Sequence, residues 1–158
     1  MHIHFVCTGN TYRSRLAEMY LRSKELSNLQ VSSSGIEASK NLSGPISWYT
    51  SRLAKHNKIA KHLSHSWTQT TKKLLLTANI VVFMAPIHRD RGEKEFDFKG
   101  KHETWNIPDL SDLGIMPALN TLEEDLRRIK FSEETFEKIQ RKVDGLIEAL
   151  SKTVSEDS

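Results

Sequence analysis

The segment from residue 7 to residue 14, Cys-Thr-Gly-Asn-Thr-Tyr-Arg-Ser, constrains the fold of this chain more than any other. It contains Cys7, the single cysteine among 158 residues. An apolar run at residues 3–6 precedes it and is typical of a buried strand, and a helical pattern follows at residues 14–27. A loop between a strand and a helix points backbone N–H groups and the positive end of the helix dipole at one place. The sequence therefore predicts an anion-binding loop that carries its own thiol.

The residue types in this loop suit a bound phosphate. Gly9 permits a tight turn, Asn10 tolerates a left-handed conformation, and Arg13 presents a planar fork that can hold two phosphate oxygens. The same field favours the thiolate of Cys7, which could attack phosphorus, and the hydroxyl of Ser14 could donate to the sulfur as it leaves. An inert core thiol is the alternative for Cys7 taken alone. The residues predicted to bind phosphate are Thr8, Gly9, Asn10, Thr11, Tyr12, Arg13 and Ser14.

Strand and helix patterns alternate along the rest of the chain. Strands are predicted at residues 3–6, around 29–33, at 80–84 and around 103–107, and helices at 14–27, 47–56, 68–77 and 118–150. This order predicts a single-domain, three-layer α/β fold with a central, mostly four-stranded parallel sheet and helices on both faces. The domain is predicted to span residues 1–150, followed by a polar, disordered tail at 151–158. Ligands of such sheets bind at the carboxyl ends of the strands, where Cys7, Ser33 and Met84 are expected.

Composition excludes several classes of protein. A formal charge of +3, with 37% hydrophobic and 27% charged residues, is ordinary for a soluble domain and does not indicate nucleic-acid binding. No apolar run approaches the roughly 20 residues that span a bilayer, and no signal peptide is recognisable. One cysteine provides no disulfide framework and suits a reducing compartment. We therefore expect a cytoplasmic protein, not bound to membranes, that is a monomer or a weak homo-oligomer.

Several other patterns have structural alternatives. His2 and His4 alternate along the first strand, and His62 and His65 are three apart, but neither pair has companion ligands, so no metal and no cofactor is predicted. The dense charge run at residues 88–95 is predicted to be a solvated loop and helix start. Residues 121–128 and 132–150 show apolar side chains at helical spacing, and Ser132 is a candidate N-cap for the second stretch.

Trp48 and Tyr49 begin a predicted helix after a loop at residues 41–45. They could wall a substrate cleft, because an aromatic ring can stack on a phosphorylated phenol. Alternatively, they simply pack the helix against the sheet.

Taken together, these residues resemble the low-molecular-weight protein tyrosine phosphatases. The signature of that family is Cys-x5-Arg-Ser/Thr near the N-terminus, with Gly-Asn inside the loop and an Ala-Glu pair in the helix, as at residues 7–14 and 17–18 here. Residues 31–35 resemble the family's strand ending in Ser-Ala-Gly, and residues 78–84 resemble its central strand ending in methionine. Residues 107–109, Ile-Pro-Asp, resemble its acid loop. The resemblance covers nearly the whole chain.

The resemblance implies roles for individual residues. Cys7 would be the nucleophile, Arg13 the phosphate clamp and Asp109 the general acid. Asp112 lies on the same loop, but Asp109 follows Pro108 as the family acid does. The substrate would be a phosphorylated protein or a small phosphomonoester.

The resemblance also implies a supporting hydrogen-bond network. Asn10, Ser14 and Ser33 would hold the loop and the sulfur. A family histidine would join them, and His65 or His62 is the candidate here.

Four departures from the family pattern bear on function. Tyr12 replaces a common second cysteine, so a protective disulfide with Cys7 is absent. Arg15 replaces a proline and is expected to add charge near the mouth of the site. Asp109 is followed by Leu-Ser instead of proline and an aromatic residue. Thr11 replaces a larger aliphatic residue and resembles the related bacterial protein arginine phosphatases.

The expected activity is therefore hydrolysis of phosphotyrosine through a cysteinyl-phosphate. The alternatives are a protein arginine phosphatase, favoured by Thr11, and a non-catalytic phosphate-binding module. Thioredoxin-coupled arsenate reductases share the loop, but their disulfide relay needs more cysteines than Cys7.

Overall fold

The computed structural model describes residues 1–114 and 120–157, which form an α/β fold around one parallel sheet. The strands β1 (His2–Cys7), β2 (Gln30–Gly35), β3 (Ile80–Phe83) and β4 (His102–Thr104) are arranged in the order β2-β1-β3-β4. All neighbouring pairs are parallel. The helices are α1 (Arg13–Ser23), α2 (Trp48–His56), α3 (Lys72–Thr77), α4 (Pro86–Phe96) and α5 (Thr121–Glu156), with 3-10 helices η1 (Ala38–Lys40), η2 (Ala60–His62) and η3 (Leu110–Leu113). The predicted fold class is confirmed.

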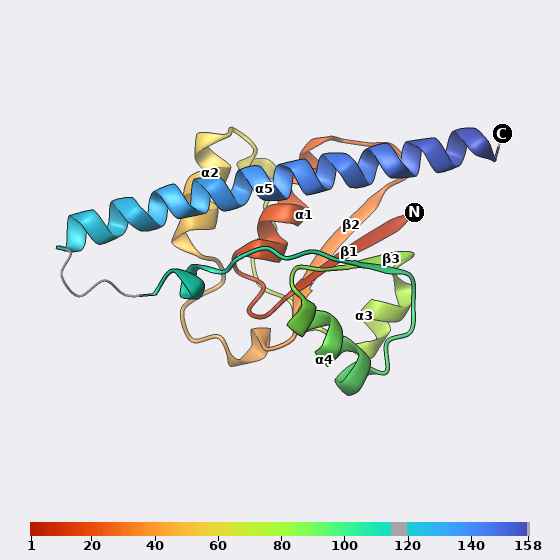
Figure 1. The fold of residues 1–158 in the computed structure, drawn as a ribbon, viewed down its shortest axis with the longest axis horizontal. Coiled ribbons are helices and arrows are strands. Elements are labelled where there is room, and N and C mark those ends of the chain that lie inside the picture. Colours follow the sequence, from red (N-terminus) through yellow and green to blue (C-terminus); the bar gives the residue numbers. More distant parts are fainter. Residues whose placement is uncertain (115–119, 158) are drawn as a thin grey trace.

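Helices cover both faces of the sheet (Figure 1). The sheet separates two apolar cores. Alternate residues of a strand point to opposite faces, so Ile3 and Phe5 face α1, α2 and α5, whereas Val6 faces the smaller core beside α3. In Figure 1, α5 runs across the full length of the molecule on the same side of the sheet as α1 and α2. Because strands in the middle of a three-layer fold are covered on both sides, β1 is buried at every position, including its two histidines.

A chain of hydrogen bonds accounts for those buried histidines. The Oγ of Ser32 lies 2.6 Å from His2 Nε2 and 2.6 Å from His4 Nδ1. On the other side of the ring, His4 Nε2 lies 2.7 Å from Ser34 Oγ, which in turn lies 2.6 Å from Thr70 Oγ1. Burial, with a smaller contribution from His2, lowers the pKa of His4 to about 3. The imidazole of His4 is therefore neutral, and both of its nitrogens lie within hydrogen-bond distance of serine hydroxyls.

Two predicted helices are shorter than expected. α1 ends at Ser23 instead of residue 27, because Glu25 and Asn28 take left-handed conformations with φ of 49° and 61°. α3 begins at Lys72 rather than at residue 68, because residues 68–71 are extended: Gln69 pairs with Gly35 at the edge of β2. At residues 68–71, hydrogen bonds to the end of β2 override the local helical pattern.

The charge run at residues 88–95, predicted as a solvated loop and helix start, lies entirely within helix α4, so the helical part of the prediction is confirmed and the loop part is wrong. Pro86 occupies the start of the helix, where its missing N–H costs nothing. His88 and Gly92 are buried, and a Cβ on Gly92 would lie 2.9 Å from the ring of Phe83. The glycine therefore lets α4 approach β3 closely, and the charged residues cover the outer surface of the helix.

The C-terminal helix α5 is continuous over 36 residues, which corrects two expectations. Ser132 does not start a helix: it is buried inside α5, and its hydroxyl donates to Ile129 O at 2.7 Å. The tail predicted as disordered is helical as far as Glu156, and the hydroxyls of Ser151 and Thr153 donate to carbonyls one turn earlier. The predicted start at residue 118 falls outside the described residues. No described helix is both long enough and apolar enough to cross a membrane.

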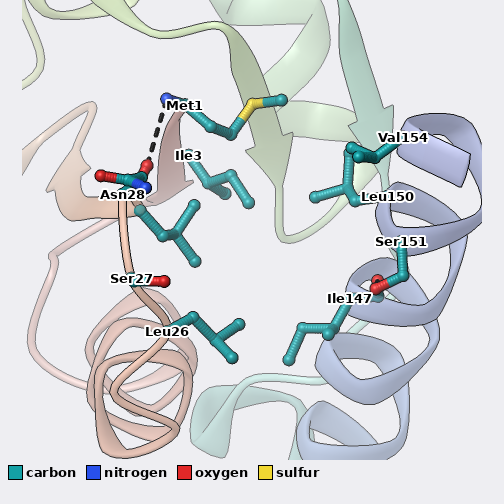
Figure 2. A pocket seen from close by; sticks show the side chains of 10 residues that line it. Met1, Ile3, Leu26, Ser27, Asn28, Ile147, Leu150, Ser151 and Val154 are labelled. Carbon is teal, nitrogen blue, oxygen red and sulfur yellow. Dashed lines mark hydrogen bonds between the residues drawn. The ribbon is translucent and has the colours of Figure 1, made fainter. Parts of the chain in front are cut away.

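An apolar pocket of about 200 Å³ lies between the α1–β2 connection and the end of α5 (Figure 2). Leu26 lines one side, and Ile147, Leu150 and Val154 line the other. Because Met1 and Ile3 also line it, this pocket lies at the amino end of β1, opposite the edge where the Cys7 loop begins.

Candidate active site

The anion-binding loop leaves the carboxyl end of β1 after Cys7 and enters α1 at Arg13. Asn10 turns the chain with a φ of 55°, in the left-handed region that asparagine tolerates. Gly35, at the end of β2, lies against the back of this turn: a Cβ there would be 2.5 Å from Thr8 O and 2.7 Å from Asn10 N. Only glycine at position 35 allows the loop to pack this closely against the neighbouring strand.

The carbonyl oxygens of the loop are bonded to surrounding segments. Thr8 O accepts from Glu37 N at 2.8 Å, and Thr11 O accepts from Ser47 N at 3.1 Å and Thr50 Oγ1 at 2.8 Å. No peptide in the described residues is cis, so each peptide N–H points away from its carbonyl. Holding these carbonyls on the outside therefore turns the following N–H groups toward the inside, where an anion would bind.

The sulfur of Cys7 lies at the base of the loop, and Cys7 as a whole is 3% exposed. Ser14 Oγ lies 2.8 Å from Sγ, and Asn10 N donates to Sγ at 3.3 Å. The side-chain Nδ2 of Asn10 donates to Ser14 Oγ at 2.7 Å and to Ser33 Oγ at 2.9 Å, and its side-chain Oδ1 accepts from Thr68 N at 2.8 Å. The structure thus brings together the predicted network of Asn10, Ser14 and Ser33.

Neither histidine proposed for this network joins it. In the described part of the chain, no hydrogen bond connects His62 or His65 with the loop; His62 lies near a surface glutamate instead. Helix α1 places the carboxylate of Glu18 there, where it accepts from Ser33 Oγ and pairs with Arg22 Nη1 at 2.7 Å. A carboxylate on the helix five residues after Arg13 can reach under the loop. The Ala-Glu pair at residues 17–18 was therefore a sequence signal that could have predicted this role of Glu18.

Arg13 and Asp109 face each other across the opening of the loop. Arg13 Nε lies 3.6 Å from Asp109 Oδ1, and Arg13 Nη1 donates to Ile107 O at 3.1 Å. Asp109 is further oriented by Ser111 Oγ, which donates to its other oxygen at 2.7 Å. The carboxylate of Asp112 instead accepts from the backbone N–H of Asp109 at 2.8 Å. Geometry therefore separates the two acidic residues, and Asp109 is the one that faces the loop.

A cavity of about 550 Å³ opens at this place. It is lined by Thr8, Arg13, Ala85, Ile87, Asn106, Ile107, Pro108, Asp109, Ser111, Asp112 and Lys138. Trp48 and Tyr49 do not line it, contrary to the cleft hypothesis. Tyr49 packs against the larger core, while the 61%-exposed Trp48 joins it in a separate groove facing Leu122 and Leu126 of α5.

His88 is a residue that the sequence did not associate with the site. It is 1% exposed, and its Nε2 lies 2.8 Å from Thr8 Oγ1 at the edge of the cavity. Burial, reinforced by the nearby charge of Arg13, lowers the pKa of His88 to about 3. A neutral imidazole therefore fixes the Thr8 side chain.

Two of the departures from the family pattern are buried. Burial raises the pKa of Tyr12 to about 12, so its side chain is neutral beside the site. The sequence predicted that Arg15 would add charge near the mouth of the site, and this prediction is wrong: Arg15 is 1% exposed, lies behind the loop and donates to backbone carbonyls. Among the described residues, no cluster of three or more histidine, cysteine or acidic side chains could hold a metal ion.

Comparison with known proteins places these features in a family. The model of the family described as "Low molecular weight phosphotyrosine protein phosphatase" matches residues 2–158. The chain is 37% identical over 92 residues to a protein-arginine-phosphatase of Bacillus subtilis, covering 56% of this chain and 59% of that protein. It is 30% identical over 105 residues to a protein-arginine-phosphatase of Geobacillus stearothermophilus, covering 66% and 68%.

Solved structures of similar fold support the same family. A low molecular weight protein tyrosine phosphatase from Bacillus subtilis superposes with a TM-score of 0.74 at 25% identity, covering 96% of this chain and 98% of that one. The YwlE arginine phosphatase from Geobacillus stearothermophilus superposes with a TM-score of 0.76 at 25% identity, covering 99% and 97%. With the match to the family model across the chain, these findings show that the protein belongs to the low molecular weight phosphotyrosine protein phosphatase family.

Proposed function

We propose that this protein is a protein phosphatase that works through a cysteinyl-phosphate intermediate and prefers phosphoarginine. The observation that carries the first part is the position of Cys7 Sγ at the base of a loop whose carbonyls face outward, with Arg13 and Asp109 across its opening. Phosphotyrosine, the substrate favoured by the sequence alone, is the second candidate.

In the first step, Cys7 Sγ attacks phosphorus and forms the S–P bond as the bond to the leaving group breaks. Arg13 and the loop N–H groups stabilise the charge on the transferring oxygens. Asp109, held over the site by Ser111 Oγ at 2.7 Å, gives its proton to the leaving nitrogen or oxygen.

In the second step, water attacks the phosphorus and the S–P bond breaks. Asp109, now a carboxylate, takes the proton of the water. The hydroxyl of Ser14, 2.8 Å from Sγ, stabilises the departing thiolate. Phosphate leaves, and Cys7 returns to its starting state.

The cavity favours a cationic leaving group over an aromatic one. Two carboxylates, Asp109 and Asp112, line it beside the cations Arg13 and Lys138, and a carboxylate pairs well with a guanidinium. Among the described residues that line it, none is phenylalanine, tyrosine or tryptophan. Thr11 and the names of the two curated relatives also support phosphoarginine. The second candidate retains support from the family and from the tyrosine phosphatase of similar fold.

Steady-state hydrolysis of two peptides of identical sequence, one carrying phosphoarginine and the other phosphotyrosine, tests this proposal. We expect kcat/KM to be at least ~10-fold higher for phosphoarginine. The Thr11→Ile variant should have a lower ratio of kcat/KM for phosphoarginine to kcat/KM for phosphotyrosine. It should still release phosphate. The Cys7→Ser variant provides the blank.

Three outcomes would contradict the proposal in different ways. A preference for phosphotyrosine in the unsubstituted protein would transfer the assignment to the second candidate. An unchanged ratio in Thr11→Ile would remove Thr11 as the determinant. Turnover of neither peptide above the Cys7→Ser blank would favour the non-catalytic phosphate-binding module.

A further inference from the structure

Arg15 is among the largest fully buried side chains of the protein. Its Nη1 donates to Asn10 O at 3.2 Å and to Pro45 O at 3.1 Å, and its Nη2 donates to Ser64 O. These carbonyls come from three segments: the anion-binding loop, the approach to α2 and the connection after η2. A planar guanidinium can hold all three at once, whereas a lysine ammonium at the end of a flexible chain is a single point.

The bond to Asn10 O acts on one peptide group of the loop. That carbonyl and the N–H of Thr11 belong to the same trans peptide, so they point in opposite directions. Arg15 holds the carbonyl from behind, which directs the Thr11 N–H toward the inside of the loop. The carbonyls of Thr8 and Thr11 are held by backbone or hydroxyl donors instead, so Asn10 is the position where a charged side chain provides the donor.

The charge of Arg15 is compensated from within helix α1. Burial lowers the pKa of Arg15 from its ordinary value, and the negative charges of Glu18 and Cys7 oppose that shift. A guanidinium remains protonated even so. A permanent positive charge therefore lies behind the loop, next to Asn10 O.

We propose that Arg15 is a positioning residue of the anion site, which fixes the Asn10–Thr11 peptide from behind so that the Thr11 N–H is held ready for a phosphate oxygen. This proposal rests on the proposed function only in taking phosphate as the ligand. It assigns a task to a residue that replaces the proline usual at this position in the resembling family.

The test measures binding of inorganic phosphate, not turnover. Calorimetric titration of Arg15→Lys and Arg15→Met at a temperature where circular dichroism shows both folded should give affinities at least ~10-fold weaker than wild type, because an anion-binding donor is no longer oriented. Arg22→Met is the matched control: Arg22 also lies on α1, donates to a backbone carbonyl (Val31 O, 2.9 Å) and pairs with Glu18, but it does not contact the loop. It should lower the melting temperature and leave phosphate affinity unchanged.

A spectroscopic measurement separates positioning from stability. In wild type, the Thr11 amide resonance should shift on addition of phosphate. In Arg15→Met that shift should be lost while the Gly9 amide still responds. In the unsubstituted protein, the guanidinium resonances of Arg15 should be resolved by slow rotation and should move when phosphate binds, which keeps the proposal testable if neither Arg15 variant folds.

Phosphate affinity within twofold of wild type in folded Arg15→Met, or a Thr11 amide that still shifts, would overturn the proposal. So would guanidinium resonances of Arg15 that are averaged by free rotation. Phosphate binding without hydrolysis of either peptide would refute the proposed function but leave these criteria for Arg15 intact. Failure of wild type to bind phosphate would refute both.

Discussion

Replacing Gly35 by alanine tests whether close packing between β2 and the anion-binding loop holds the site in place. A Cβ at this position would lie 2.5 Å from Thr8 O, 2.7 Å from Asn10 N and 2.8 Å from Gly9 C. All three atoms belong to the backbone, so no side chain can rotate away. Ordinary contact begins at 3.4 Å, so strand or loop must move by about 0.9 Å (3.4 − 2.5).

The expected cost has two parts. Overpacking of this kind destabilises a protein by about 1–3 kcal/mol. A displacement of about 1 Å at reacting groups can lower the rate roughly 100-fold. Because the shifted atoms lie between Cys7 and Asn10, we expect Gly35→Ala to lower kcat/KM by about two orders of magnitude and to weaken phosphate binding while the sheet still forms.

The assay is hydrolysis of the preferred phosphopeptide, with urea unfolding measured on the same samples. Gly145→Ala is the control, because Gly145 lies inside α5 with no atom within 4 Å of its added Cβ. That variant should gain about 0.5–1 kcal/mol of stability and keep its activity. A Gly35→Ala enzyme with kcat/KM within threefold of wild type would refute the argument that this contact sets the loop.

Three further predictions concern acidity, catalysis and oxidation. His4 and His88 stay neutral in the fold, with pKa values lowered from 6.5 to about 3, so the stability they contribute is complete above pH 6.5 and is lost as pH falls toward 3. At pH 5, 1.5 units below the unfolded pKa, each of these two histidines lowers the free energy of unfolding by about 2 kcal/mol (1.36 × 1.5). His88→Asn should therefore flatten the dependence of the urea midpoint on pH between 7.5 and 5, and an unchanged slope would contradict this. Asp109→Asn should lower kcat by about 10²–10⁴-fold while phosphate affinity changes little, and an equal loss in both would argue against an acid–base role. Tyr12 offers no second thiol that could trap the sulfenic acid of Cys7 as a disulfide, so peroxide should carry Cys7 on to irreversible oxidation states. Dithiothreitol added after peroxide should then restore only part of the activity, and full recovery would refute the expectation.

The sequence by itself determined the fold class and the centre of the site. Residues 7–14 are consecutive, and the sulfur, the left-handed turn at Asn10 and the guanidinium of Arg13 all belong to one strand–loop–helix unit. The alternation of strands and helices was likewise readable, because each element has a local period. The ends of the helices were predicted less well than their order. Helix α1 ends early where Glu25 takes a left-handed conformation, and α5 continues through Ser132 without a break.

Only the tertiary structure decided what holds the loop in shape. Glu37 and Ser47 reach its carbonyls from segments 29 and 36 residues away from their acceptors Thr8 and Thr11, and no periodic pattern encodes such contacts. Helix α1 places Glu18 within hydrogen-bond reach of Ser33, whereas the two histidines expected in this network make no such contact in the described part of the chain.

The sequence also did not predict the burial of His88 and Arg15. His88 lies within a charge run, yet the close approach of α4 to β3 buries it against the site. Arg15, expected at the mouth, is directed behind the loop because three carbonyls converge there and a buried guanidinium must be hydrogen-bonded. Sequence thus specified which groups perform the chemistry, and packing between distant segments specified how those groups are oriented.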